Sequence, residues 1–171
     1  MVLTKDELLA ALNREVHILL HLAGKVEESY LDYRPTPGQR STLELIQYLT
    51  IMGRTQIALI KNGVFNMPTL SAAWGPAVAA SKELTFEQAV AAIRAQPEEY
   101  RREFSEWADE DFRRNVDMFG STVSRGALLV SQVLGVYAAY RTQLFCYLKS
   151  CGRTEMGTIN LWAGMDAMAA A

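Results

Sequence analysis

Histidine and cysteine, the residue types that most often bind transition metals, are scarce in this sequence of 171 residues, which contains two of each. The cysteines, Cys146 and Cys151, are close together in a segment whose pattern is helical, so a structural disulfide between them is not expected. Two thiols alone cannot complete a four-ligand zinc site. Free thiols in a reducing compartment are the expected state of both residues.

Neither charge nor hydrophobicity is concentrated anywhere in the chain. It has 17 Lys and Arg against 19 Asp and Glu, and no basic stripe, so nucleic acid is not an expected partner. No apolar run reaches about 18 residues, which argues against a membrane-spanning helix. The opening residues, MVLTKDELL, carry charges where a signal peptide needs an apolar run. These absences predict a cytoplasmic protein that interacts with neither membrane nor nucleic acid.

The composition is that of an ordinary globular protein, with 50% hydrophobic and 21% charged residues. A chain of this length favours one domain with a single core. We therefore expect one domain over residues 1–171, with its core in residues 4–153 and a tail over residues 154–171.

Capping signals mark the first two predicted helices. Residues 4–7 (TKDE) form a capping box, and apolar residues then recur at spacings of three and four as far as Tyr30. This pattern predicts a helix of about seven turns that ends before the prolines of segment 35–38. A second capping box at residues 41–44 (STLE) opens a helix that should end near Gly63.

The remaining segments predict two more long helices. Residues 64–84 contain two prolines and lack a sustained period, so we expect a long irregular connection with at most one short helical turn. Thr85 should cap a third helix, kinked or broken at Pro97. Residues 108–120 read as a polar loop, and Ser124 opens a fourth helix that stops at Gly152.

The tail adds one short helix, with Trp162 anchored on the bundle. Four long helices without an alternating strand pattern indicate an all-α protein, an up-down-down-up-type four-helix bundle.

Two segments resemble the DinB-like family. The first is PTPGQRS at residues 35–41, leading into LELIQYL at 43–49. The second is YAAYRTQL at 137–144, followed by YL at 147–148 and CG at 151–152. The order of the helices agrees as well, and the resemblance spans about residues 4 to 153. It implies thiol-dependent transferase or isomerase chemistry at a divalent metal, often zinc or nickel.

The resemblance also implies where that metal would bind. In the family, one histidine on the second helix and an HxxxH pair on the fourth hold it. The matching positions here are Tyr48, Val136 and Tyr140, and none is a histidine. A first-row metal usually needs three or more donors, valine offers none, and a neutral phenol with a pKa of about 10 is a poor ligand. We therefore predict no metal cofactor, with zinc or nickel as the alternative, and two tyrosines in its place.

Two nearby polar residues are candidates for ligand binding. Arg141 follows an inward-facing residue, so it either holds an anion in the pocket or pairs with an acid at the end of the bundle. Gln47 precedes Tyr48 and offers an amide that can bond to a ligand or to another glutamine.

The two histidines, His17 and His21, share one helix face, as two metal ligands would. That face points away from the bundle interior, and no third ligand lies within helical reach. A surface or subunit-interface pair is the favoured interpretation, and a metal site is the weaker alternative.

Two functional hypotheses remain. The first is a small-molecule-binding or dimeric assembly protein that kept the bundle without its metal. Ile18 and Leu22, apolar residues outside the main stripe of the first helix, suggest burial on two sides and hence a homodimer. The alternative is a thiol-dependent transferase or hydrolase-like enzyme that uses the same pocket, with or without a divalent metal. If tyrosine and arginine replace the metal there, this alternative predicts a lowered tyrosine pKa.

Overall fold

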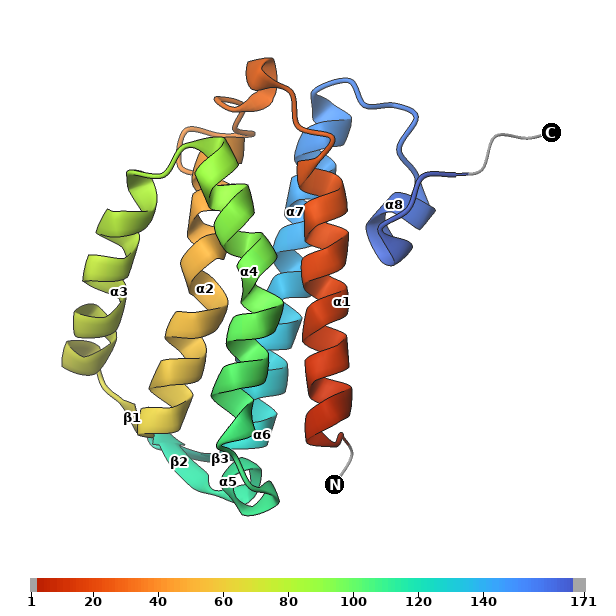
Figure 1. The fold of residues 1–171 in the computed structure, drawn as a ribbon. Helices are drawn as coiled ribbons and strands as arrows, with labels where there is room; N and C mark the ends of the chain where they lie inside the picture. The colour runs from red at the N-terminus through yellow and green to blue at the C-terminus, as the bar shows by residue number, and fades with distance from the viewer. Residues whose placement is uncertain (1–2, 168–171) are drawn as a thin grey trace.

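Four long helical segments lie side by side and form the bundle (Figure 1). The structure is a computed structural model and describes residues 3–167. The first and last segments run in one direction and the two between them in the other, so the expected all-α, up-down-down-up arrangement is confirmed. The four segments are α1 (Lys5–Ala23), α2 (Thr42–Asn62), α4 (Phe86–Ser105), and a composite of α6 (Arg125–Leu128), η2 (Leu129–Leu134) and α7 (Gly135–Ser150).

The helix starts predicted from capping residues are confirmed. Thr4, Ser41 and Thr85 each accept a hydrogen bond from the third helical amide, and the Glu or Gln at that position bonds back to the cap. Ser124 caps α6 in the same way, without the return bond. Gly63 closes α2 with a φ of 75°, in the left-handed region that glycine adopts at little cost.

The first helix is shorter than predicted. It ends at Ala23, and a short 3₁₀ turn, η1 (Glu28–Tyr30), follows after a break. Val26 and Tyr30 nevertheless pack against the core. The apolar spacing continues past Ala23 because the loop folds back onto the bundle. The regular spacing there reflects the burial of loop residues and not a continuous helix.

The segment expected to be irregular contains a 16-residue helix, α3 (Met67–Lys82). Pro68 lies in its first turn, where a missing amide hydrogen leaves no helical bond unmade, and Asn66 caps the amide of Thr69 at 2.9 Å. The apolar period is weak because α3 lies outside the bundle against α2 and leaves most of its side chains in solvent (Figure 1). The prediction of a loop here was wrong.

Two smaller departures concern the third helix and the segment after it. Helix α4 continues through Pro97, so the helix is not broken there, and that part of the expected kink or break was wrong. Residues 108–120, expected as a polar loop, contain the short helix α5 (Asp109–Arg113) and the first strand of a hairpin.

A small sheet closes one end of the bundle. Strand β2 (Asn115–Met118) pairs in parallel with β1 (Val64–Phe65) and antiparallel with β3 (Ser121–Ser124). Phe119 and Gly120 form the turn between β2 and β3 with φ values of 55° and 84°, the positive angles that two-residue hairpins favour. The longest strands have four residues, too few for an alternating pattern to be recognised.

The fourth long segment is not a uniform α-helix. Its middle, η2, is π-helical, and α-helix continues on both sides. A π turn holds more residues than an α turn, because its hydrogen bonds reach five residues instead of four. It therefore helps to keep residues spaced by four on one face, and the buried residues Leu129, Val133, Tyr137 and Arg141 have that spacing.

The predicted C-terminal helix is present as α8 (Thr158–Ala163) and packs against α1. Ile18 and Leu22 are fully buried within the chain, and an added Cβ on Gly164, just after α8, would lie 3.0 Å from the Ile18 Cα. The second apolar flank of α1 is thus covered by the chain itself, which removes the reason for expecting a dimer there. Within residues 3–167, no helix is long and apolar enough to span a bilayer.

Candidate functional site

An open pocket of about 650 Å³ lies where the loop before α2 meets α2, α3 and α7. Its volume is in the range of small-molecule sites. Tyr48 and Tyr140 lie in its wall, together with Gln47, Gln143 and the cationic side chains of the loop and of α3. The positions singled out on two distant helices are therefore brought together.

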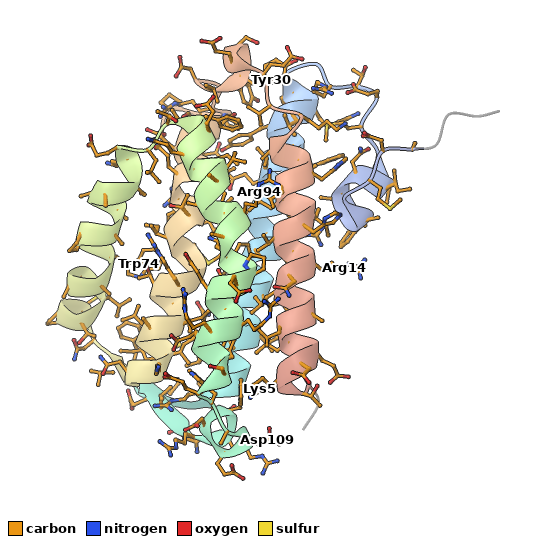
Figure 2. The ribbon with its side chains drawn as sticks, in the orientation of Figure 1. Lys5, Arg14, Tyr30, Trp74, Arg94 and Asp109 are labelled. Carbon is orange, nitrogen blue, oxygen red and sulfur yellow. The ribbon has the colours of Figure 1, made fainter. Side chains whose placement is uncertain are left out.

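The two tyrosines belong to a stacked aromatic cluster. Their ring centroids are 5.2 Å apart, in an edge-on arrangement. Trp74 points from α3 towards α2 (Figure 2) and stacks on Tyr48 with a centroid distance of 5.6 Å. The Arg40 guanidinium lies 4.0 Å from the Tyr48 centroid, within cation–π range. Val136, the third matched position, is half-buried against the core and does not line the pocket.

Tyr48 is held in its neutral form. Burial, reinforced by Tyr140, raises its pKa to about 12, and the nearby charge of Arg40 only partly opposes this rise. A phenol that keeps its proton at neutral pH is a poor metal ligand and a poor nucleophile. The enzyme hypothesis required a lowered tyrosine pKa, and the shift at Tyr48 has the opposite sign.

Two glutamines hold the pocket walls in place. Gln47 is buried, and its amide donates to the carbonyls of Leu84 at 2.8 Å and Lys82 at 3.2 Å, which ties the end of α3 to α2. Gln143 donates to the Tyr147 hydroxyl, which in turn donates to the Arg40 carbonyl at 3.0 Å.

Arg141 does not line this pocket. It is 5% exposed on the far side of α7, where its Nε lies 2.5 Å from a carboxylate oxygen of Glu15. Its guanidinium also donates to the Leu161 carbonyl and lies 4.8 Å from the ring centroid of Trp162. Of the two roles considered for Arg141, the contact with Glu15 corresponds to pairing with an acid. The same side chain also holds α8 against the bundle. Trp162 itself is 55% exposed.

The buried ion pair gives a stability prediction. Replacing Arg141 with methionine should lower the free energy of unfolding by about 2 kcal/mol, because the Glu15 carboxylate would stay buried without its partner. Burial already raises the pKa of Glu15, and the Arg141 charge is what counteracts it. Urea unfolding would measure the loss. Arg101→Met, at an exposed residue paired with Glu98, is the control and should cause no measurable loss. Equal stability of the two variants would contradict the prediction.

The histidine pair lies beside the C-terminal segment, with His17 exposed and His21 half-buried. The Nε2 of His21 is 3.1 Å from the Asn160 amide nitrogen and 3.7 Å from a carboxylate oxygen of Asp166, and His17 lies next to Gly164. Burial lowers the pKa of His21, and Asp166 partly offsets this effect. Across residues 3–167, no three His, Cys, Asp or Glu side chains are grouped so as to hold a metal ion.

Sequence reasoning missed Arg34, Arg40 and Lys82, which line the pocket, and Trp74, which stacks on Tyr48. Arg34 and Arg40 bracket the proline-rich segment, but nothing in the sequence shows that the loop folds over Tyr48. Trp74 and Lys82 belong to α3, which was taken for a loop, so no helix face was available on which to place them.

Comparison with known proteins identifies the fold. No family model matches the sequence, and no curated protein matches it. Among solved structures, a DinB-like protein of Bacillus subtilis, YjoA, is 19% identical, with a TM-score of 0.65 over 88% of this chain and 94% of that one. A DinB-like protein of Bacillus cereus ATCC 10987 is 15% identical, with a TM-score of 0.66 over 89% and 95%. At these identities the likeness concerns the fold.

Proposed function

We propose that this chain, which has the DinB-like fold, is a single-domain protein that binds a small molecule in the Tyr48–Tyr140 pocket without a metal ion. The observation that carries the proposal is the character of the pocket wall. An open cavity of small-molecule size presents two phenols, one of them with a pKa of about 12. They stand at two of the three positions that match the metal-binding histidines of the DinB-like family. Such a wall favours binding over metal chemistry.

The rest of the lining also favours binding over catalysis. The Ser81 hydroxyl is buried and donates to the Val78 carbonyl at 3.0 Å, so it is not poised as a nucleophile. Neither cysteine lines the pocket: Cys146 is exposed elsewhere on α7, and burial raises the pKa of Cys151. A reactive thiolate needs a lowered pKa.

Two further parts of the proposal concern assembly and location. Apolar surface is exposed on the C-terminal segment at Ile159, Trp162 and Met165. Since Ile18 and Leu22 are buried within the chain, this exposed surface is the one that supports a homodimer. Light scattering after size exclusion should give twice the chain mass of 19.1 kDa, and a monomer would exclude the dimer.

The proposed location is the cytoplasm. Both cysteines are free thiols, which is the state expected in a reducing compartment.

Metal and thiol binding separate the proposal from its enzymatic alternative. In tag-free protein, elemental analysis should find far less than one zinc or nickel ion per chain. Thermal shift with zinc chloride, nickel chloride and the uncharged thiols 2-mercaptoethanol and dithiothreitol should show no stabilisation. One tightly held ion per chain, or stabilisation by a thiol that Tyr140→Ala abolishes and Cys146→Ala preserves, would instead support the transferase alternative.

A further inference from the structure

Positive charge is concentrated around the pocket, although the chain carries a net charge of −2. Arg34, Arg40 and Lys82 lie in the lining, with Glu44 as its one carboxylate. Glu44 is paired with Arg34 at 3.3 Å. In the part of the chain that the structure describes, no carboxylate lies within 4.0 Å of the Arg40 or Lys82 charge. The pocket therefore has two cations that no acid within residues 3–167 neutralises.

Arg40 is oriented to receive a ligand. One face of the Tyr48 ring stacks on Trp74, and the Arg40 guanidinium lies 4.0 Å from the Tyr48 centroid. A guanidinium lying on an aromatic ring keeps its in-plane N–H groups free for hydrogen bonds. Carboxylates and phosphates match these groups in two-point contacts.

The main chain is fixed at both cations. Tyr147 donates to the Arg40 carbonyl, and Gln47 donates to the Lys82 carbonyl. Each bond fixes the backbone and leaves the charged side chain, exposed in both residues, in the lining of the pocket. A site whose backbone is already in place loses less entropy when a ligand binds.

From these contacts we propose that the ligand of the pocket is a small organic anion, whose carboxylate or phosphate group is bound by Arg40 and Lys82. The inference rests on the proposed function and specifies its ligand class. The cavity of about 650 Å³ exceeds the needs of a bare inorganic ion and leaves room for an organic body. Tyr140 and the Tyr48 edge supply apolar surface for that body.

The test compares each anion with an uncharged compound that has the same aromatic ring. Isothermal titration calorimetry would measure benzoate against benzamide, phenyl phosphate against phenol, and inorganic phosphate alone. We expect each anion to bind at least about 10-fold more tightly than its neutral partner, since one charge-assisted contact contributes about this factor. Affinity for the anions should fall as salt rises. The carboxylate and phosphate arms show which group the site prefers.

Variants connect the binding to named residues. Arg40→Gln and Lys82→Gln should each weaken anion binding at least about 10-fold, while Arg101→Gln, an exposed cation on α4 outside the pocket, should leave it unchanged. Tryptophan emission provides a second readout, because an anion that engages Arg40 alters the stack on Trp74, and the signal should disappear in Trp74→Phe. Thermal unfolding would confirm that every variant is folded.

The outcomes distinguish the inference from the function on which it rests. Neutral compounds that bind as tightly as the anions would overturn the anion class and leave a small-molecule site. Anion binding that survives both Arg40→Gln and Lys82→Gln would place the anion elsewhere and also overturn the inference. If neither the anions nor the neutral compounds bind, the inference and the proposed function both fail.

Discussion

Replacing Gly53 with alanine should lower the free energy of unfolding by about 3 kcal/mol, through overpacking and a disturbed buried hydrogen bond. Gly53 lies on α2 at the centre of the bundle, where a Cβ would lie 2.0 Å from the Tyr100 hydroxyl and 2.8 Å from the Tyr137 hydroxyl. No flexible side-chain end can absorb this clash, because both rings are fully buried. The better helix propensity of alanine returns only about 1 kcal/mol.

The hydroxyls that Gly53 accommodates belong to a buried network. The Tyr100 and Tyr137 oxygens are 2.5 Å apart, and the Tyr137 hydroxyl donates to Gln96 at 2.7 Å. Gln96 in turn donates to the Leu49 carbonyl at 2.9 Å. Burial raises the pKa of both tyrosines, so the network stays neutral. It joins α2, α4 and α7, and displacing one member leaves buried polar groups unpaired.

Urea unfolding would measure the effect of Gly53→Ala. Gly38→Ala is the control, because Gly38 lies in an exposed turn without a positive φ and has no atom within 4 Å of an added Cβ, and it should cause no loss. Adding Tyr100→Phe to Gly53→Ala removes the nearer of the two clashing oxygens and should restore part of the lost stability. A Gly53→Ala variant as stable as the native chain would contradict the packing at this position.

Introducing histidine at the three matched positions should create a zinc-binding site. The triple variant Tyr48→His, Val136→His, Tyr140→His should bind one Zn²⁺ per chain with a Kd of about 1 μM or tighter, a binding free energy of about −8 kcal/mol. The Tyr48 and Tyr140 rings are already 5.2 Å apart. Position 136 lies one helical turn before 140, at the spacing that brings two ligands onto one face.

Competition against a zinc-binding dye would measure the affinity of the triple variant. Each of the three double variants, which lack one histidine, should bind at least about 10-fold more weakly, since three donors are needed for a stable site. Binding should weaken as the pH falls below about 6.5, because protonated imidazole cannot bind a metal. A triple variant that binds no better than the doubles would show that the match of positions 48, 136 and 140 is wrong.

The sequence predicts the bundle well where local chemistry decides the structure. Thr4, Ser41, Thr85 and Ser124 begin helices because their side chains satisfy free amides in any context. The errors occur where burial, not local preference, decides. Helix α3 packs one side on α2 and also carries alanines on its exposed side, so its apolar period is weak. The end of α1 was misplaced because loop residues after it are buried as regularly as helical ones.

The candidate site divides in the same way. The placement of Tyr48 and Tyr140 at one site was implied by the resemblance to the DinB-like family, and the inward direction of Tyr140 follows from the apolar face of its helix. The roles of Arg40 and Lys82 depend on how a loop and an outer helix fold over the bundle, which no period records. Arg141 directly follows Tyr140, and a step of about 100° around the helix sends it to Glu15 instead of the pocket.

The π-helical segment η2 has a consequence for how relatives of this chain are aligned. In effect a π turn is an α-helical turn with one residue inserted, and here it precedes both Val136 and Tyr140. An alignment that carries α6 through to α7 without a gap, against a relative whose helix is regular, would be one residue out of register from residue 135 onward. The pocket tyrosine would then be equated with the neighbour of its true counterpart, and Ala139 would be mistaken for a residue of the binding site.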